Sequence, residues 1–272
     1  TVIIGELSLD GKINRTNGVF AMCEEARSLG IKRVIIPKAN SNEVSVLKGI
    51  DIIPVTTLND VIKYLNKEIY IEKVVERKIE FVKKYNMDFT DIKGQENIKR
   101  ALEVASAGGH NVLMIGSPGS GKTALAKRIL TILPDLTLEE AIETTKIHSV
   151  SANLTREGLI LSRPFRMPHH TVPIKSIIGG GKVPVPGEIS LAHNGILFLD
   201  ELTEYNRSTL EALREPLEEK EITINRLSGN YRYPCNFMFV ASMNPCPCGF
   251  FGSKEKECTC APRAIEKYMG KI

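Results

Sequence analysis

The chain has 272 residues, of which 42% are hydrophobic and 25% charged, and its formal net charge is +4. This length permits one large or two ordinary domains, and the composition is that of a globular protein without low-complexity tracts. No apolar run approaches the roughly 20 residues that a membrane-spanning helix needs, and no signal peptide opens the chain, so we expect no membrane partner. The modest positive charge permits a polyanionic partner without arguing for one.

Residues 1–66 alternate between strand and helix signals. Apolar runs at residues 33–37 and 51–55 predict buried strands, and apolar residues at helical spacing predict helices near residues 19–26 and 58–65. These signals predict a small α/β unit. Because the chain begins at Thr1 and ends without a closing pattern, we expect it to be a piece of a longer protein.

A charged stretch over residues 67–87 separates this unit from the next. Its apolar residues recur at helical spacing, which predicts a linker helix whose charges lie on a solvated face. A second domain is expected over residues 88–272, opening with a helical stripe at 98–105 and a strand at 111–115.

A glycine-rich loop follows that strand and leads into a helix. It reads Gly116-Ser117-Pro118-Gly119-Ser120-Gly121-Lys122-Thr123. The spacing matches the phosphate-binding loop G-x-x-x-x-G-K-[ST], and the strand before it and the helix after it are the context that this motif requires. Glycines let backbone N–H groups turn toward an anion, and a helix start adds partial positive charge. We expect Lys122 to bind ATP phosphates and the Thr123 hydroxyl to bind Mg²⁺. The alternative is a chance match in an ordinary Gly-rich turn.

Two further strands end in polar side chains. The apolar run at residues 195–199 ends in Asp200 and Glu201, and the run at 236–242 leads to Asn244. The first run predicts a central parallel strand, because a strand buried on both faces is apolar throughout. We expect Asp200 to hold Mg²⁺, Glu201 to activate the attacking water, and Asn244 to sense the γ-phosphate from a strand between the other two. The alternatives are an acidic pair in the first turn of a helix and a local turn before Pro245.

Four cysteines lie in two close pairs, Cys246 with Cys248 and Cys258 with Cys260. Four thiolates match a tetrahedral zinc site in number and type, although the C-x-C pairs are tighter than the usual spacing. The alternatives are two disulfides or unligated thiols. Chemistry that uses ATP, together with clustered cysteines, favours the reducing cytoplasm, where metal binding is commoner than disulfide formation.

Two basic segments could contact the phosphates of DNA. One lies between the phosphate loop and the acidic strand and contains Lys175, Gly179-Gly180-Gly181-Lys182, Arg163, Arg166 and the pair His169-His170. The other is a predicted hairpin over residues 221–233 with Arg226 and Arg232 on its arms. The alternative is that both are ordinary surface loops or subunit contacts, since no aromatic stacking platform stands out. The two histidines point different ways on any regular element, so they are left unassigned.

Residues 89–264 resemble the magnesium-chelatase-like branch of AAA+ ATPases, and within it the competence-type members. The resemblance rests on five strings: residues 91–95, the phosphate loop, residues 163–171, residues 186–195 and residues 244–249. It implies a homo-oligomeric, hexameric ring that couples ATP hydrolysis to movement along DNA, including branch migration during uptake of foreign DNA. It also implies that the arginine finger follows the cysteine loop beyond Ile272, so this chain alone is expected to hydrolyse ATP near background.

Residues 1–66 are similar to the C-terminal part of a Lon-protease-like domain, through Gly5-Glu6-Leu7, Asp10-Gly11 and residues 30–37. No lysine near residues 14–19 can be placed as a catalytic partner, so the similarity implies a fold and no peptidase activity. We therefore predict a P-loop AAA+ parallel-sheet core preceded by a partial Lon-protease-like α/β domain. The rival functions are a chelatase-type subunit that remodels a partner protein, the ATPase partner of a peptidase, and a nucleotide-dependent scaffold without turnover.

Overall fold

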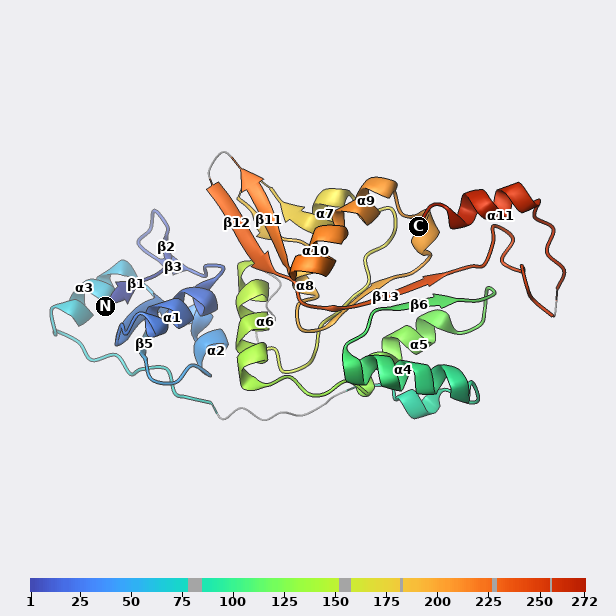
Figure 1. Ribbon diagram of the computed structural model, residues 1–272. Helices are drawn as coiled ribbons and strands as arrows, with labels where there is room; N and C mark the ends of the chain where they lie inside the picture. The colour runs from blue at the N-terminus through green and yellow to red at the C-terminus, as the bar shows by residue number, and fades with distance from the viewer. Residues whose placement is uncertain (78–84, 152–157, 182, 227–228, 255) are drawn as a thin grey trace. The chain divides into compact units, whose positions relative to one another are not determined.

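The computed structural model describes residues 1–77, 85–151, 158–181, 183–226, 229–254 and 256–272 (Figure 1). These residues form two compact units. One contains residues 1–82 and 137–161, and the other contains residues 83–136 and 162–272. Across the described residues, no helix is both long enough and apolar enough to span a membrane.

The N-terminal unit is built on a parallel sheet with the strand order β1-β4-β5. Its strands are β1 (Val2–Ile3), β4 (Arg33–Pro37) and β5 (Asp51–Val55), and Val34 lies opposite Ile52. Its helices are α1 (Val19–Ser28), α2 (Ser41–Val44) and α3 (Leu58–Leu65), with a short hairpin of β2 (Glu6–Leu7) and β3 (Ile13–Asn14). The predicted strands and helices of this α/β unit are confirmed, while its likeness to a Lon-protease-like domain stays a prediction.

Helix α6 (Leu138–Val150) belongs by contact to this N-terminal unit, although its sequence lies inside the range 88–272. Its start is held by a capping box between Thr137 and Glu140. Its far end packs on α1, where the Gly18 N–H donates to the Ser149 carbonyl at 3.0 Å. The compact units therefore differ from the predicted residue ranges at this helix.

The predicted linker helix over residues 67–87 is wrong over residues 67–77 and 85–87, none of which is helical. The remaining part of that prediction, residues 78–84, lies outside the described residues. The Val74 N–H donates to the Ile52 carbonyl of β5 at 2.8 Å, and Lys73 pairs with Asp51 at 3.1 Å. Backbone groups that bond to a neighbouring strand cannot also close helical turns, so contact with β5 overrides the helical spacing of the apolar residues.

The second unit is built on a four-stranded parallel sheet with the order β6-β13-β10-β7. The strands are β6 (Val112–Ile115), β7 (Phe165–Arg166), β10 (Ile196–Leu199) and β13 (Met238–Met243). All four residues of β10 are fully buried, because alternate side chains enter cores on opposite faces of the sheet. The strand of Asn244 lies between the phosphate-loop strand and the acidic strand, as predicted.

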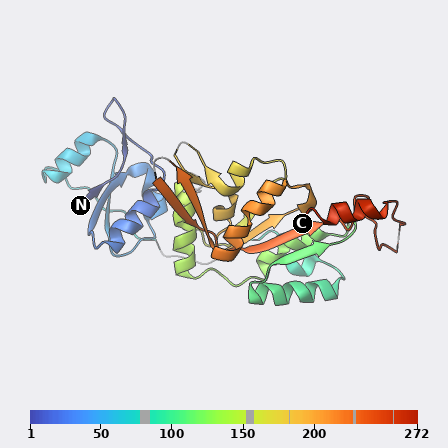
Figure 2. The same ribbon diagram turned by 45° about the horizontal axis from the view of Figure 1, so that its top comes forward.

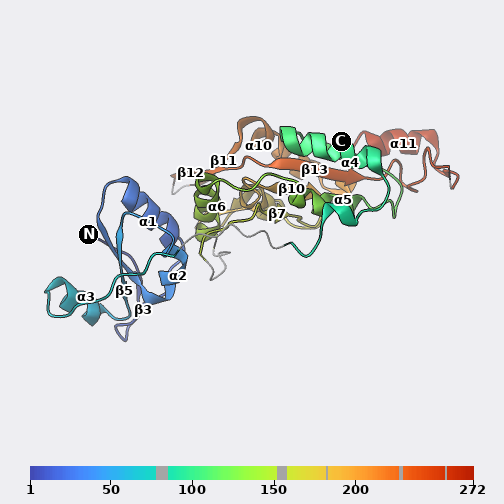
Figure 3. The same ribbon diagram turned by 90° about the horizontal axis from the view of Figure 1, so that it is seen from below.

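Helices cover both faces of this sheet. Figure 1 and Figure 2 show α4 (Glu96–Gly108) and α5 (Lys122–Arg128) on one face, and Figure 3 views the sheet from the side of α4. The other face carries α7 (Ile174–Ile178), α8 (Glu188–Leu191), α9 (Arg207–Ala212) and α10 (Arg214–Glu219). The predicted hairpin pairs β11 (Glu221–Arg226) with β12 (Gly229–Pro234).

The remaining elements are short. They are β8 (Gly179–Gly180), β9 (Val185–Pro186), α11 (Pro262–Met269) and the 3₁₀ turns η1 (Lys38–Asn40), η2 (Phe89–Asp91), η3 (Ile129–Thr131) and η4 (Leu202–Glu204). The α/β class, with a P-loop AAA+ parallel-sheet core, is confirmed.

Candidate active site

Three strand ends meet at the carboxyl edge of the second unit's sheet. The phosphate loop follows β6, Asp200 and Glu201 follow β10, and Asn244 follows β13. Together they line a cavity of about 430 Å³, whose walls are residues 118–124, 200–201 and 242–244. Ligands of open α/β sheets bind at this edge, where the loops after several strands converge.

The phosphate loop has the backbone shape that its glycines permit. Gly119 and Gly121 have φ of 78° and 82°, in the left-handed region that favours glycine. Gly121 precedes the first residue of α5, so Lys122 and Thr123 stand at the helix start. The loop is tied to the neighbouring strand by the Gly116 N–H, which donates to the Met243 carbonyl at 3.3 Å.

The Lys122 ammonium lies at the centre of this arrangement. It donates to the carbonyls of Gly116 at 2.7 Å and Ser117 at 3.0 Å, and to Asn244 Oδ1 at 3.3 Å. Burial lowers the pKa of Lys122, and the charges of Asp200 and Glu201 oppose that shift. A phosphate group in the cavity would offer the same ammonium charged acceptors, with which hydrogen bonds are stronger.

Asp200 and Thr123 are brought together as the sequence predicts. The Thr123 hydroxyl donates to Asp200 Oδ2 at 2.7 Å. Ser242, on β13, donates to the other carboxylate oxygen, and the Glu201 N–H also donates to that oxygen at 3.2 Å. Hydroxyl and carboxylate oxygens are hard ligands of the kind that Mg²⁺ prefers, so this donor set fits a magnesium ion.

Ser242 is a residue that sequence reasoning missed. It lies inside an apolar run and is almost fully buried. The only signal for it was a hydroxyl at the carboxyl end of a strand predicted to be central.

Glu201 has an unusual backbone conformation for a residue with a side chain. Its φ is 53°, in the left-handed region, and its side chain is 59% exposed. Non-glycine residues in this region are uncommon and concentrate at functional sites. The conformation turns the chain sharply at the end of β10, so Glu201 lines the cavity beside Asp200.

His170 lies beside Glu201, which the sequence analysis did not anticipate. Its Nδ1 is 4.0 Å from Glu201 Oε2, and both side chains line a second cavity of about 580 Å³ with Asn244 and Pro247. The His170 ring stacks on His169 at 4.2 Å between centroids and meets Tyr205 edge-on at 6.2 Å. The buried Tyr205 hydroxyl donates to the Pro168 carbonyl at 2.5 Å.

His169 differs from its neighbour. Its Nδ1 lies 2.8 Å from the Thr171 hydroxyl and accepts the Thr171 N–H at 3.3 Å, so its ring is held by its own turn. The expectation that adjacent histidines share no metal site is untested, but only His170 faces Glu201. His170 follows the end of β7 by four residues, and Glu201 follows β10. Because β7 and β10 are neighbours in the sheet, the two side chains come close together.

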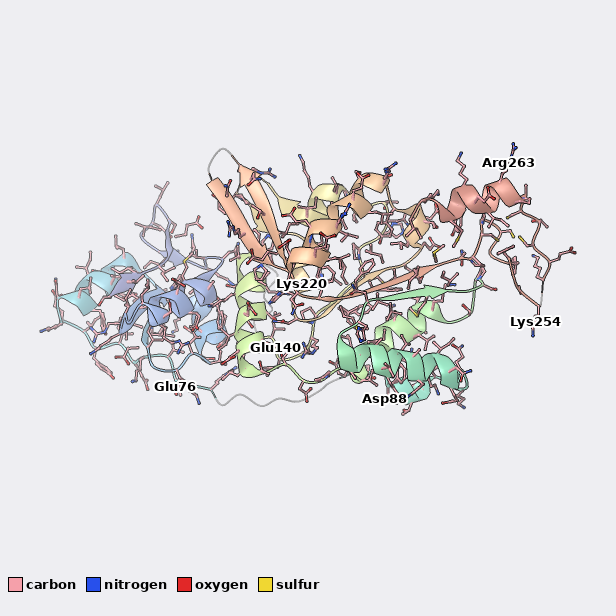
Figure 4. The ribbon with its side chains drawn as sticks, viewed as in Figure 1. Glu76, Asp88, Glu140, Lys220, Lys254 and Arg263 are labelled. Atoms are coloured by element: carbon pink, nitrogen blue, oxygen red, sulfur yellow. The ribbon has the colours of Figure 1, made fainter. Side chains whose placement is uncertain are left out.

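The four cysteines of the predicted metal site lie together. Their Sγ atoms are all within 4.8 Å of one another, on the segment between β13 and α11. Figure 4 shows sulfur atoms gathered between the labelled residues Lys254 and Arg263. All four are free thiols in the structure, with Cys246 buried and the others half-buried. Backbone N–H groups of Phe250 and Thr259 lower the pKa of Cys248 to about 6.

The basic residues divide into two groups. Arg163 donates to the carbonyls of Pro134 at 2.6 Å and Asn194 at 2.8 Å, and Arg166 pairs with both oxygens of Glu188 at 2.5 Å and 2.7 Å. These two guanidinium groups are engaged with groups of the chain itself, and their contact with phosphates stays a prediction.

Lys175, Arg226 and Arg232 are exposed. Antiparallel register places Arg232 opposite Thr223, so it lies on the other face of the hairpin from Ile222, Ile224 and Arg226. The structure therefore does not bring the two arginines onto one face. Lys182, the fourth candidate, lies outside the described residues.

The sequence is similar to those of known proteins over almost its whole length. Residues 88–272 match the family model of magnesium chelatase, subunit ChlI, and residues 1–40 match a model of subunit ChlI of Mg-chelatase. The chain is 41% identical over 273 residues to "Competence protein ComM" of Haemophilus influenzae, covering 99% of this chain and 53% of that protein. It is 40% identical over 275 residues to "Uncharacterized protein YifB" of Escherichia coli, with the same coverage of 99% and 53%.

The chain thus spans about half the length of these curated relatives. A solved structure of a complex between subunits BchI and BchD of magnesium chelatase is also similar, with 22% identity and a TM-score of 0.47, over 65% of this chain and 58% of that chain. Since one family model covers most of the chain, including every residue that lines the cavity at the strand ends, the chain belongs to the magnesium chelatase subunit ChlI family of AAA+ proteins.

Proposed function

We propose that this chain is the nucleotide-binding part of a Mg²⁺-dependent ATPase. The observation that carries the proposal is the convergence of Lys122, Thr123, Asp200, Glu201 and Asn244 on one cavity at the carboxyl edge of a parallel sheet. These residues follow three strands: Lys122 and Thr123 follow β6, Asp200 and Glu201 follow β10, and Asn244 follows β13. Five groups suited to one reaction are therefore held within one rigid framework.

Each residue has a role that its chemistry suits. Lys122 binds the β- and γ-phosphates of ATP, and backbone N–H groups of the phosphate loop surround them. Thr123 and Asp200 hold Mg²⁺, which when bound neutralises developing charge on the phosphates. Glu201 orients a water molecule and accepts its proton, and Asn244 contacts the γ-phosphate from the strand between the two.

The first test is nucleotide binding by the chain with paired lysine variants. Lys122→Ala should remove Mg-ATP binding, measured by titration calorimetry, because it deletes the main cation of the pocket. Lys127→Ala is the matched control, since Lys127 lies on the same helix, is exposed and does not line the cavity. Tight ATP binding by Lys122→Ala would contradict the site assignment.

Glu201→Gln separates binding from hydrolysis. It removes the proton acceptor but keeps the shape, so ATP binding should persist while hydrolysis by the full-length protein falls to near background. Equal loss of binding in Lys122→Ala and Glu201→Gln would mean that Glu201 supports the pocket and is not the base.

We further propose that the full-length protein works as a homo-oligomeric ring on DNA, coupling hydrolysis to movement in the cytoplasm. Two observations support this: a relative named for competence matches almost the whole chain, and Lys175, Arg226 and Arg232 are exposed cations on α7, β11 and β12. Exposed arginines and lysines bind phosphates without reading sequence.

DNA stimulation of ATP hydrolysis tests this motor proposal in the full-length protein. The logarithm of DNA affinity falls linearly with the logarithm of salt concentration. Arg226→Ala and Arg232→Ala should each make that slope shallower by about 1, if each arginine contacts one phosphate. Arg207→Ala is a matched control, because Arg207 is exposed but pairs with Glu211 on α9. The family description favours a second candidate, remodelling of a partner protein, and an ATPase indifferent to DNA would support it.

We also propose zinc as a structural ion at Cys246, Cys248, Cys258 and Cys260. Four thiols that are free and close together fit a tetrahedral ion better than two disulfides. Metal analysis of untagged protein should find one zinc per chain.

A further inference from the structure

We propose that the zinc-bound cysteine loop braces the nucleotide pocket, so that removing the metal weakens ATP binding. The cysteine loop is defined here as residues 246–260. This inference rests on the proposed nucleotide site and the proposed zinc ion, and it adds a physical link between them that neither motif implies.

The sulfur positions match a single tetrahedral ion. Cys246 Sγ lies 3.4 Å from Cys248 Sγ and 3.7 Å from Cys258 Sγ, and Cys248 Sγ lies 3.6 Å from Cys258 Sγ. A tetrahedron with zinc–sulfur bonds of about 2.3 Å has sulfur–sulfur edges of about 3.8 Å. Disulfide sulfurs would be about 2.05 Å apart. These three thiols are therefore spaced as ligands of one ion, and Cys260 Sγ lies within 4.8 Å of them.

Backbone groups of the loop already support thiolate ligands. The Cys248 N–H points to Cys260 Sγ at 3.4 Å, and the Phe251 N–H points to Cys246 Sγ at 3.3 Å. Hydrogen bonds to ligating sulfur fix its orientation and offset its negative charge. Tetrahedral sulfur sites select zinc or iron–sulfur clusters, and a set this compact favours one zinc ion.

The cysteine loop has little else to hold its shape. Its described residues form no helix or strand, and Phe251, which could have anchored it in a core, is 55% exposed. Among the loop's described residues, Cys246 is the best buried side chain. A segment with few buried apolar groups depends on cross-links or metal for order.

The first link to the nucleotide pocket runs along the chain. Asn244, whose side chain accepts a hydrogen bond from Lys122, precedes Cys246 by two residues. Pro247, between two of the cysteines, lines the second cavity together with Glu201 and Asn244. The first metal ligand therefore follows Asn244 closely in the chain. A metal ion held there would fix the path of the backbone directly after β13.

The second link crosses to the phosphate loop. Gly249 packs on Pro118 so closely that a Cβ at Gly249 would lie 2.6 Å from Pro118 Cδ. The tight turn that brings Gly249 there is closed by its N–H, which donates to the Cys246 carbonyl at 3.0 Å. The backbone of the cysteine loop is thus one wall against which the phosphate loop rests.

Because the binding free energies of two coupled sites are linked, any effect of the metal on nucleotide affinity is reciprocal. If zinc removal raises the dissociation constant for Mg-ATP by some factor, saturating Mg-ATP must raise zinc affinity by the same factor. Coupling between such sites commonly amounts to about 5–150-fold, and we expect an effect of at least about fivefold.

The experiment uses the chain with its zinc content measured at every step. The zinc-loaded protein, the protein stripped with a chelator, and the stripped protein reloaded with zinc alone are each titrated with a fluorescent ATP analogue and Mg²⁺. Zinc removal should weaken binding at least fivefold, and zinc alone should restore it. Circular dichroism on each sample checks that the stripped chain stays folded.

Paired glycine variants test the brace without touching the cysteines. Gly249→Ala adds a methyl group against Pro118, and should keep one zinc while lowering ATP affinity. Gly252→Ala is the matched control, because its φ of 76° is equally left-handed but a Cβ there meets nothing within 4 Å. Cys258→Ser should lose the metal, whereas Cys23→Ala, far from the cluster in sequence and in the N-terminal unit, should keep it.

Three results would overturn the inference in distinguishable ways. A folded, metal-free chain with four titratable thiols in the cysteine loop would remove the zinc itself. Equal ATP affinity of the zinc-loaded and stripped proteins would contradict the brace but not the zinc ion. A zinc-loaded wild-type chain that binds no ATP would overturn the proposed nucleotide site, and the brace with it.

Discussion

At the scale of single residues, the pair formed by His170 and Glu201 is the main addition that the structure makes to the ATPase site. His170 Nδ1 lies 4.0 Å from Glu201 Oε2, and an imidazole so placed can orient the carboxylate that takes a proton from water. Tyr205 helps to hold His170 in place, because its buried hydroxyl donates to the carbonyl of Pro168, two residues before His170.

We expect His170→Ala to lower ATP turnover by the full-length protein by about 10–100-fold, because small displacements of a catalytic group carry costs of this size. The affinity for Mg-ATP should stay the same, since His170 does not line the phosphate cavity. Steady-state kinetics would show the loss in kcat and none in KM.

His170→Gln, which keeps a hydrogen-bond donor, should recover part of the turnover. His169→Ala is the control, because the His169 ring bonds to Thr171 in its own turn. A His170→Ala variant with unchanged kcat would show that the two side chains are neighbours without a shared role.

Ser242 leads to a second prediction at this scale. Its hydroxyl and that of Thr123 each bond to one oxygen of Asp200, so the carboxylate has one orientation. Ser242→Ala should leave Asp200 Oδ1 with the Glu201 N–H but without the hydroxyl donor, and weaken Mg²⁺ binding in the ATP complex by about 0.5–1.5 kcal/mol, roughly a factor of 2 to 13. Titration with Mg²⁺ at fixed ATP measures it, and Ser208→Ala, on exposed α9, is the control.

At the scale of elements, β10 determines how the acidic pair is held. Its residues alternate between two cores: Ile196 and Phe198 pack toward α4 and α5, while Leu197 and Leu199 pack toward α7 and α8. Asp200 and Glu201 are therefore attached to a strand that cannot shift without disturbing both layers.

Phe198→Ala should destabilise the second unit by about 3–5 kcal/mol, because it leaves a cavity beneath a strand that is fully buried. Hydrogen exchange of the β10 and β13 amides, as a function of urea, would report the loss. Phe251→Ala is the matched control, since its ring is 55% exposed and outside both cores. A change below about 1 kcal/mol in Phe198→Ala, typical of surface sites, would contradict the central position of β10.

At the scale of the whole molecule, the two compact units should respond differently to nucleotide. The site lies entirely within the second unit, so Mg-ATP stabilises that unit by mass action, by about 2.7 kcal/mol at a concentration 100 times the dissociation constant. Hydrogen exchange should slow in the phosphate loop and around residues 242–249 and stay unchanged in β1, β4 and β5. Lys122→Ala should lose this protection, and equal protection of both units would contradict a single nucleotide site.

Two expectations at this scale remain predictions. The family resemblance implies that this chain alone hydrolyses ATP slowly, which a phosphate-release assay would test. The likeness of the N-terminal unit to a Lon-protease-like domain also stays a prediction, although its parallel sheet and helices are present.

Much of the fold could be predicted from local pattern. Strands β4, β5, β6, β10 and β13 and helices α1, α3 and α4 lie where apolar runs and helical spacing place them, because each pattern reports burial along one element. The pattern failed at residues 67–77, where the Val74 N–H bonds to the Ile52 carbonyl of β5. Backbone hydrogen bonds to another strand cannot be read from periodicity.

Local sequence pattern is enough to predict the chemical groups of the proposed nucleotide site and of the cysteine cluster. Spacing within the phosphate loop places Lys122 and Thr123 at a helix start through local backbone geometry alone. Four cysteines in two pairs offer four thiolate ligands wherever the chain brings them together. Other contacts can be seen only in the folded chain. His170 lies beside Glu201, Ser242 and Thr123 both bond to Asp200, and Gly249 packs on Pro118. These contacts join loops after different strands, and their proximity depends on the strand order β6-β13-β10-β7, which arises from packing between elements distant in the chain.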